Sequence, residues 1–356
     1  MPYDQPIGSG ALQPVPADVD TDTLHGGRRA AGVSGTEATD TPIAREAEAA
    51  IAAMSRSQQP LPRPVNTRTM VVANQKGGVG KTTTTVNIAA SLAQFGAKVL
   101  VVDLDPQGNA STALGIEHHS EVPSIYDVLI ERYSMEEIVQ PVEDIPGLYC
   151  APATIDLAGA EIELVSMVAR ESRLQRALAV YQNSMDYILI DCPPSLGLLT
   201  VNAMVAGKEV LIPIQCEYYA LEGLTQLLRN IELVRAHLNT DLRISTILLT
   251  MYDARTRLAS QVADEVRTHF PNEVLGTAVP RSVRISEAPS YSQTVMTYDP
   301  ASTGALAYRE AAREIVERYA QVPGQRAVPA SGDPQSNNPL RPSAESEGGT
   351  FREVAR

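Results

Sequence analysis

The chain of 356 residues contains no tryptophan, few aromatic residues (4%) and only three cysteines. Cys150, Cys192 and Cys216 stand singly, so their spacing provides neither a metal-binding motif nor a disulfide framework, which favours a reducing cytosol. No apolar run approaches the roughly 18 residues of a membrane span, and the N-terminus lacks a charged-then-apolar signal. We therefore expect a cytoplasmic protein with no membrane partner.

Aliphatic residues must build the core in place of the missing aromatics. Seven short apolar runs, continuous rather than alternating, are typical of strands that are covered on both faces. Helical patterns lie between them, for example over 224–238 and 259–270. This alternation predicts an α/β fold, with a doubly wound, mostly parallel sheet and helices on both faces, whose ligands bind at the carboxyl ends of the strands. The predicted strands are 69–74, 98–105, 147–152, 187–194, 209–215, 244–252 and 273–280.

The two ends of the chain differ in composition from its middle. Residues 1–66 and 321–356 are rich in proline, glycine, alanine and polar residues, and they lack the apolar density that would stabilise a fold. We predict that both are disordered tails on either side of one domain over 67–320. Residues 41–56 have a weak helical periodicity, interpreted as a transient helix without a partner.

Acidic residues outnumber basic ones, and lysine is scarce. The formal net charge of −13 argues on its own against a nucleic-acid partner, because non-specific binding depends on neutralising phosphates. Basic residues that cluster on one face can still form a nucleic-acid-binding surface on a chain of negative net charge. The chain has four lysines, and two of them, Lys76 and Lys81, fall in one loop.

That loop lies in the stretch VVANQKGGVGKTTTT. It departs from the phosphate-loop pattern GxxxxGK[ST], because Gln75 stands where the first glycine belongs and an additional lysine, Lys76, follows it. The glycines let backbone N–H groups point at phosphate oxygens, and the helix that begins at Lys81 adds its positive dipole end. Lys81 is predicted to neutralise the β- and γ-phosphates, and Thr82 to bind Mg²⁺. The predicted nucleotide-binding residues are Gly77, Gly78, Val79, Gly80, Lys81, Thr82 and Thr83.

Carboxylates end two other strand-like runs. Asp191 ends YILID, and Asp103 and Asp105 end VLVVDLD. Mg²⁺ bound to phosphates commonly needs a carboxylate at the end of a buried strand. We interpret Asp191 and Asp103 as part of the metal shell and Asp105 as the residue that positions the attacking water. A cap on the next helix is the alternative for Asp105.

Five motifs follow one another along residues 67–320: KGGVGKTT, VDLDPQGNAS, DYILIDCPPSLGLLT, PIQCEYYALEGL and RSVRISEAPS. Together they closely resemble the ParA/Soj chromosome-partitioning ATPases, in the deviant Walker A group of P-loop NTPases that also contains MinD and the nitrogenase iron protein. The resemblance implies ATP and Mg²⁺ as cofactors. It also implies that Lys76 reaches across an ATP-dependent homodimer to the partner's phosphates, that Lys76, Lys81 and Asp105 are catalytic, and that Asp191 is the Walker B residue.

The resemblance further implies a DNA-binding surface and a regulator. Members of this family contact double-stranded DNA non-specifically through basic residues on one face of the dimer, which places them on the nucleoid. A ParB-type centromere-binding protein, whose basic N-terminal peptide stimulates a slow intrinsic hydrolysis, is the expected partner. The predicted DNA-binding residues are Arg255, Arg257, Arg281 and Arg284. The alternative interpretation is that they are ordinary surface arginines, paired with Asp253 and Glu287.

Two other functions share such a core. A MinD-like, membrane-cycling ATPase would end in a basic amphipathic helix, which residues 321–356 do not encode because prolines interrupt them. An ATP-dependent metabolic enzyme would need a substrate pocket, or cysteines placed to hold an iron–sulfur cluster, and no motif provides either.

Two further motifs lie outside the predicted nucleotide and DNA sites. Glu217, Tyr218 and Tyr219 are either a switch or dimer contact, or the capped entry of a helix. His118 and His119 are interpreted as residues of a solvated loop rather than as a metal pair, since no other residue with ligand spacing joins them.

Overall fold

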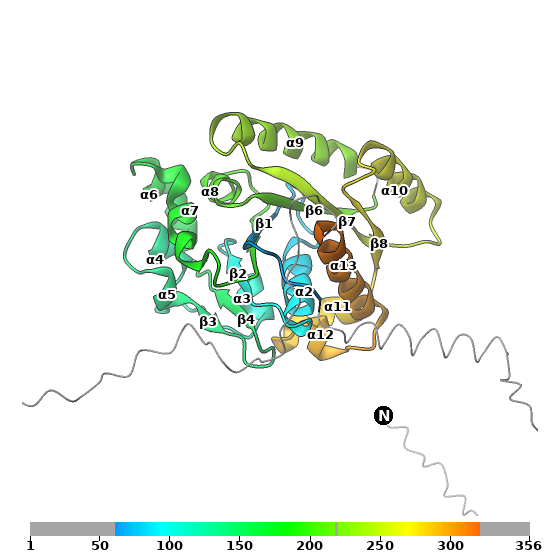
Figure 1. Cartoon of the computed structure of the whole chain (residues 1–356), viewed down its shortest axis with the longest axis horizontal. Coiled ribbons are helices and arrows are strands. Elements are labelled where there is room, and N and C mark those ends of the chain that lie inside the picture. Colours follow the sequence, from blue (N-terminus) through cyan, green and yellow to red (C-terminus); the bar gives the residue numbers. More distant parts are fainter. Residues whose placement is uncertain (1–60, 218–219, 321–356) are drawn as a thin grey trace, which may run out of the picture. The chain divides into compact units, whose positions relative to one another are not determined.

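The computed structural model describes residues 61–217 and 220–320, and an eight-stranded sheet runs through this part of the chain. The strands are β1 (Arg68–Val72), β2 (Val99–Asp103), β3 (Gln140–Pro141), β4 (Leu148–Ala151), β5 (Tyr187–Asp191), β6 (Glu209–Gln215), β7 (Arg243–Tyr252) and β8 (Val274–Pro280). Their order is β3-β4-β2-β5-β1-β6-β7-β8, and every neighbouring pair is parallel except β3 and β4 (Figure 1). The predicted doubly wound, mostly parallel sheet is confirmed.

Each of the seven predicted apolar runs overlaps a strand. The central strands β2 and β5 are buried at every position, which explains why their sequences are continuous in apolar residues up to the final aspartate. The sequence prediction missed β3, because two residues at the sheet edge, one of them a proline, give no apolar pattern.

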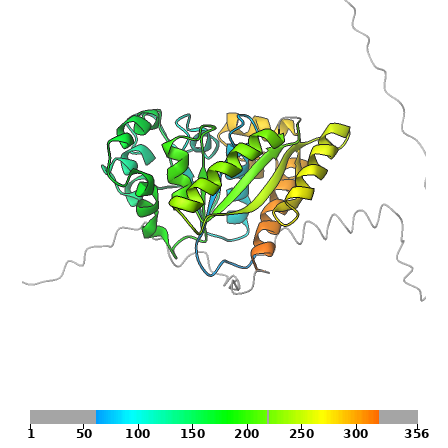
Figure 2. The same cartoon turned by 90° about the horizontal axis from the view of Figure 1, so that it is seen from above.

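Helices cover both faces of the sheet (Figures 1 and 2). Side chains of α8, α9 and α10 contribute to one buried cluster, and those of α2, α12 and α13 contribute to the other, on the opposite face. Both clusters are built mainly from Ala, Val, Leu and Ile, as the composition predicts. The helices are α2 (Lys81–Gln94), α3 (Asn109–Ala113), α4 (Ile125–Leu129), α5 (Met135–Ile138), α6 (Leu157–Val165), α7 (Arg173–Leu178), α8 (Leu198–Ala206), α9 (Ala220–His237), α10 (Arg257–His269), α11 (Val283–Glu287), α12 (Val295–Tyr298) and α13 (Thr303–Ala320).

A buried ion pair joins the amino ends of two central strands. The Arg68 guanidinium at the start of β1 donates two hydrogen bonds to Glu209 at the start of β6, at 3.0 and 2.7 Å. The guanidinium also lies 4.2 Å from the centre of the Tyr319 ring, so α13 covers the pair. This pair stabilises the end of the sheet opposite to the predicted site.

Of the two predicted tails, the structure describes only residues 61–66. Residues 1–60 and 321–356, including the weak helical pattern at 41–56, lie outside the described residues. The described part begins before the predicted domain start at residue 67: Leu61 is buried, and Arg63 donates a 2.7 Å hydrogen bond to the Gly96 carbonyl.

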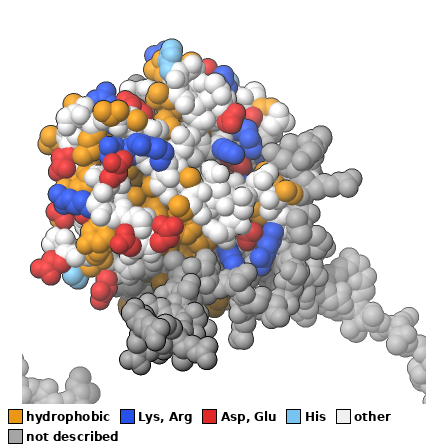
Figure 3. Space-filling model, turned by 60° about the vertical axis from the view of Figure 1, so that its left-hand side comes forward, with side chains coloured by type: hydrophobic (Ala, Val, Ile, Leu, Met, Phe, Trp, Pro, Cys, Tyr) orange, Lys and Arg blue, Asp and Glu red, His pale blue; other side chains and the backbone are white. Residues whose placement is uncertain are grey.

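The face with α6 and α7 carries acidic and basic side chains side by side (Figure 3). Large apolar side chains are exposed at Ile162 and Val165 of α6 and at Val168 beyond it. No helix within 61–217 or 220–320 has both the length and the hydropathy needed to cross a bilayer.

Candidate active site

The glycine-rich loop connects β1 to α2 at the carboxyl edge of the sheet. Asn74 organises its first half, because its amide donates to the Pro213 carbonyl at 2.8 Å and its side-chain oxygen accepts from the Lys76 N–H at 3.0 Å. Thr250 of β7 fixes the second half by donating to the Val79 carbonyl at 2.8 Å. Gly80 precedes α2 with a φ of 86°, which residues with a Cβ rarely adopt, so glycine is required there.

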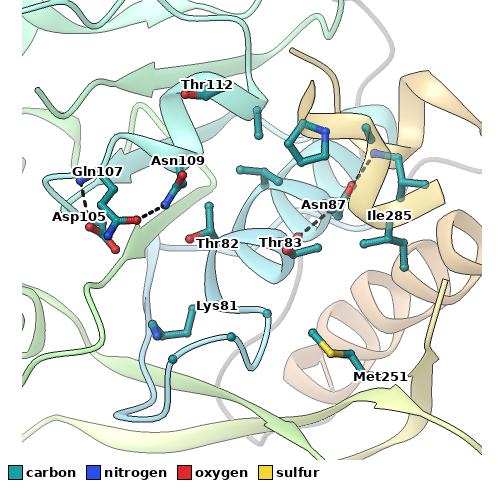
Figure 4. A pocket seen from close by; sticks show the side chains of 18 of the residues that line it. Lys81, Thr82, Thr83, Asn87, Asp105, Gln107, Asn109, Thr112, Met251 and Ile285 are labelled. Atoms are coloured by element: carbon teal, nitrogen blue, oxygen red, sulfur yellow. Dashed lines mark hydrogen bonds between the residues drawn. The ribbon is translucent and has the colours of Figure 1, made fainter. Parts of the chain in front are cut away.

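A cavity of ≈470 Å³ opens over this loop (Figure 4). One part of its wall is polar and includes the loop and three residues after β2. Another part is largely apolar and comes from Met251, Ile285, Ala288 and Pro289. A polar, cationic part beside an apolar one suits a phosphate chain with a planar base attached. The polar part contains Gly77, Gly78, Gly80, Lys81, Thr82, Thr83, Asp105, Gln107 and Asn109.

Lys81 brings positive charge into the cavity. Lys81 is only 7% exposed, and its Nζ lies 3.4 Å from the Lys76 carbonyl oxygen. Burial lowers the pKa of Lys81, while the negative charge of Asp191 opposes that shift. A partly desolvated cation at the start of a helix is well suited to bind phosphate oxygens.

Asp191 lies behind Thr82 and is fully buried at the end of β5. Its two oxygens accept hydrogen bonds from the Thr82 and Thr85 hydroxyls, at 2.7 and 3.0 Å. Burial, and then the charge of Asp103, raise the pKa of Asp191 to about 8, although both hydroxyls oppose this shift. A carboxylate destabilised in this way gains from a nearby cation.

These donors fit Mg²⁺ rather than a metal held by protein ligands alone. Among the described residues no group of three or more His, Cys, Asp or Glu side chains has metal-binding geometry. Mg²⁺ keeps several waters and is bound through one or two protein oxygens together with substrate phosphates. Thr82 and Asp191 would provide such oxygens, and Mg²⁺ bound there would supply charge neutralisation for the phosphates.

Asp105 and Asp103 have different surroundings although they are two residues apart. Asp105 lines the cavity, and its Oδ1 accepts from the Gln107 N–H at 3.0 Å. This hydrogen bond closes a turn over residues 105–107. The residue that precedes α3 is Gly108, so Asp105 is not the helix cap that the alternative interpretation required.

Asp103 is fully buried, and the protein engages both of its oxygens. One accepts from the Ser111 N–H and hydroxyl at 2.9 and 2.7 Å, and the other accepts from the Asp105 N–H at 3.2 Å. Burial is the main reason that the pKa of Asp103 is raised to about 6. Asp103 therefore holds the loop that carries Asp105, and its place in a metal shell stays a prediction.

Lys76 is placed differently from Lys81. Its Nζ lies 2.9 Å from Glu217 Oε2, beyond the end of β6, and both side chains are partly exposed. Lys76 is not among the described residues that line the cavity of its own chain. The signature lysine is thus beside the nucleotide site but directed to a carboxylate outside it.

The four predicted DNA-binding arginines lie on the surface near two strand ends. Arg255 is 89% exposed and pairs with Asp253 at 2.9 Å. Hydrogen bonds from the Arg255 side chain and N–H are the main reason that the pKa of Asp253 is lowered to about 2. Arg284 pairs with Glu287 at 3.1 Å. These are the two pairings of the alternative interpretation, so the arginines' role in DNA binding stays a prediction. Arg281 lies 4.0 Å from Glu217, and Arg257, the first residue of α10, is exposed.

Several residues of the site were not predicted. Asn74 and Thr85 flank the glycine-rich loop in the sequence, and their polar side chains on a buried strand and helix were the available signal. Met251 and Pro289 gave no local signal, because they reach the cavity only through the packing of β7 and of the 3-10 helix Ala288–Tyr291 that follows α11.

Similarity to known proteins agrees with this geometry. A family model described as an AAA domain matches residues 67–244. The chain is 54% identical to the sporulation initiation inhibitor protein Soj of Bacillus subtilis (strain 168) over 246 residues, which are 69% of this chain and 97% of that protein. The chain belongs to the Soj/ParA family. A second Soj/ParA relative, the chromosome partitioning protein ParA of Myxococcus xanthus (strain DK1622), is 50% identical over 251 residues, 70% of this chain and 88% of its own.

Solved structures share the fold of this Soj/ParA member. One is cobyrinic acid a,c-diamide synthase from Mycobacterium smegmatis with bound ATP analog and magnesium, with a TM-score of 0.63, 38% identity, and coverage of 73% of this chain and 99% of that one. Another is the cell division ATPase MinD of Pyrococcus furiosus, with a TM-score of 0.59, 27% identity, and coverage of 70% and 98%. This Soj/ParA chain is accordingly an ATPase, and its site takes ATP and Mg²⁺.

Proposed function

We propose that this ATPase segregates DNA by cycling between a free monomer and an ATP-bound dimer that holds DNA. The observation that carries the proposal is the position of Lys76. Its ammonium group stands next to the nucleotide site yet pairs with Glu217, 2.9 Å away, rather than lining the cavity of its own chain. A cation in that position is available to a triphosphate in a second subunit.

ATP then joins two chains. Each chain binds its own phosphates through Lys81 and the start of α2, and each receives Lys76 from the partner. Charge from the second subunit is most effective where phosphate charge is greatest, which is at the γ-phosphate. ADP lacks that group, so hydrolysis weakens the dimer.

DNA binding follows from dimerisation. Arg255, Arg257, Arg281 and Arg284 are proposed to neutralise DNA phosphates, and a dimer presents two such sets. Affinity rises steeply with the number of phosphates neutralised. The acidic partners Asp253 and Glu287 compete with DNA for Arg255 and Arg284, and the whole chain is negatively charged, so a single subunit is expected to bind poorly.

A partner protein is proposed to time the cycle. The family resemblance indicates a ParB-type centromere-binding protein that stimulates slow intrinsic hydrolysis. The chain then works in the cytoplasm on the nucleoid, and each hydrolysis event releases it from DNA.

A gel-shift series tests this function. DNA of arbitrary sequence is titrated with the full chain in ATP, in ADP and in a slowly hydrolysed ATP analogue, at rising salt. We expect a shift with ATP and with the analogue that weakens as salt increases. Equal shifts in ATP and ADP, or no shift at low salt, would contradict the proposal.

An ATP-dependent synthase is the second candidate, because one solved structure of the same fold carries that name at 38% identity. The partitioning function is favoured by the higher identity, 54%, to Soj over 97% of its length. Phosphate release measured with DNA, with liposomes and with candidate small-molecule acids separates the two, and the liposome arm also tests a membrane-cycling ATPase. Stimulation by a small acid but not by DNA would favour the synthase.

A further inference from the structure

His118 lies against the loop that carries Asp105. Its Nε2 is 2.9 Å from the Thr112 hydroxyl of α3, and the ring is partly buried. Burial, and then the neighbouring His119, lower the pKa of His118. His118 and His119 lie in a loop, as the sequence predicts, and His118 is in addition hydrogen-bonded to the site's own helix while His119 is exposed.

The ring of His118 fits directly over Gly108. A Cβ placed on Gly108 would lie 2.5 Å from His118 Cδ2 and 3.2 Å from the Ala153 carbonyl oxygen. Gly108 also has a φ of 63°, in the left-handed region. His118 and the Ala153 carbonyl therefore both lie close to Gly108 on the side where a side chain would project, and they leave no room for one.

The hydrogen bonds around Thr112 define which group donates. The Thr112 hydroxyl donates its single proton to the Gly108 carbonyl at 3.0 Å. With the proton assigned to this carbonyl, which can only accept, the Thr112 oxygen accepts from the Nε2–H tautomer of His118 at 2.9 Å. His118, Thr112 and Gly108 form a closed chain of contacts at the end of the loop that begins at Asp105.

We propose that His118 is a positioning residue for ATP hydrolysis. By donating to Thr112 and covering Gly108, it holds the segment 105–109 in the conformation in which Asp105, Gln107 and Asn109 face the cavity (Figure 4). The proposal rests on the proposed role of Asp105 in placing the attacking water. Small displacements of a positioning group cost 10- to 100-fold in rate, while binding of the phosphates depends on the glycine-rich loop.

Three variants test the proposal in the full chain with Mg-ATP. His118→Ala is expected to lower kcat by about 10- to 100-fold and to change KM for ATP by less than about twofold. His118→Gln keeps a side-chain N–H that reaches Thr112 and is expected to restore most of kcat. His119→Ala is the matched control, because it removes an exposed imidazole next door, and it is expected to keep the parental kcat.

Several results would overturn the proposal. One is an unchanged kcat in His118→Ala. Another is an equal loss in His118→Gln, or a loss that simply follows a lower melting temperature, because either would indicate a structural role. In a double-mutant cycle with Thr112→Val, the two losses must not add, since both remove the same hydrogen bond; additive losses would contradict it.

The role of Asp105 is separable from that of His118. Full turnover in Asp105→Ala would remove the proposed role of Asp105. The His118 series would still report whether kcat depends on the loop, because its variants leave Asp105 in place.

Discussion

Lys76 and Glu217 form an ion pair between the glycine-rich loop and the segment after β6, with 2.9 Å between Nζ and Oε2. Gln215 donates to the other carboxylate oxygen of Glu217, and Arg281 lies 4.0 Å from that same oxygen. Glu217 thus connects the signature lysine to one of the proposed DNA-binding arginines. In the proposed dimer, Lys76 must leave this carboxylate before it can reach the phosphates of a partner.

Glu217→Gln is expected to ease dimerisation, because it removes the charge that holds Lys76 in its own chain. The pair is partly exposed, and such pairs contribute about 0.2–1 kcal/mol, so the ATP concentration at half-maximal dimer should fall by at most about fivefold. Light scattering during an ATP titration measures it. Glu232→Gln, which breaks an exposed pair with Arg235 on α9, is the control. Weakened dimerisation in Glu217→Gln would instead place Glu217 among the residues that stabilise the dimer.

Asp105→Ala is expected to stop turnover without preventing ATP binding. Asp105 lines the cavity, whereas binding relies on Lys81 and the glycine-rich loop. Loss of a group that positions or activates water lowers the rate by about 100- to 10,000-fold. Phosphate release gives the rate, and gel filtration in ATP gives the dimer, which should persist. Turnover at the parental rate would exclude Asp105 from the reaction.

Arg284→Glu is expected to lose DNA while keeping nucleotide. Arg284 now pairs with Glu287 and Asp299, at 3.1 and 3.4 Å, and a glutamate there would repel both DNA and its neighbours. Affinity for DNA in ATP should fall at least tenfold, with a shallower dependence on salt. Arg235→Glu on α9, which also breaks an exposed ion pair, controls for net charge. Equal losses in the two variants would mean that Arg284 has no special place in DNA binding.

Glu209→Gln is expected to destabilise the fold and to change its pH dependence. Burial alone would raise the pKa of Glu209, but Arg68 and Arg243 outweigh burial, so the folded-state pKa lies below its ordinary value of 4.5. A lowered carboxylate pKa stabilises the fold above pH 4.5, and this stability is lost as pH falls through the folded-state pKa. The variant should lose about 3–5 kcal/mol at pH 7, because Arg68 stays buried without a counter-charge.

Urea unfolding at pH 3 to 7 measures the difference in the free energy of unfolding between Glu209→Gln and its parent. The difference in stability between the parent and Glu209→Gln should become smaller as pH falls below 4.5. Glu310→Gln, which removes an exposed carboxylate of α13, is expected to change stability little at any of these pH values. A constant difference between Glu209→Gln and its parent across the range would contradict the assigned sign of the shift.

The strands and the phosphate-binding loop were predictable because each depends on local sequence. Continuous apolar runs ending in Asp103 and Asp191 identify buried strands, and glycines before Lys81 identify the turn into α2. The pairing of Lys76 with Glu217 joins residues 141 positions apart, so it depends on the order of the strands. The contact of His118 with Thr112 was not predicted either, because it depends on the turn between them, which gives no pattern in the sequence.

The central claim is that ATP joins two chains through Lys76, and sedimentation velocity of the full chain tests it most directly. The measurement compares the Asp105→Ala variant with the double variant that carries both Asp105→Ala and Lys76→Ala. At saturating Mg-ATP we predict a dimer for Asp105→Ala, a monomer for the same variant in Mg-ADP, and a monomer for the double variant in either nucleotide. A monomer under every condition, or a dimer that forms equally well without Lys76, would contradict ATP-dependent pairing through this lysine.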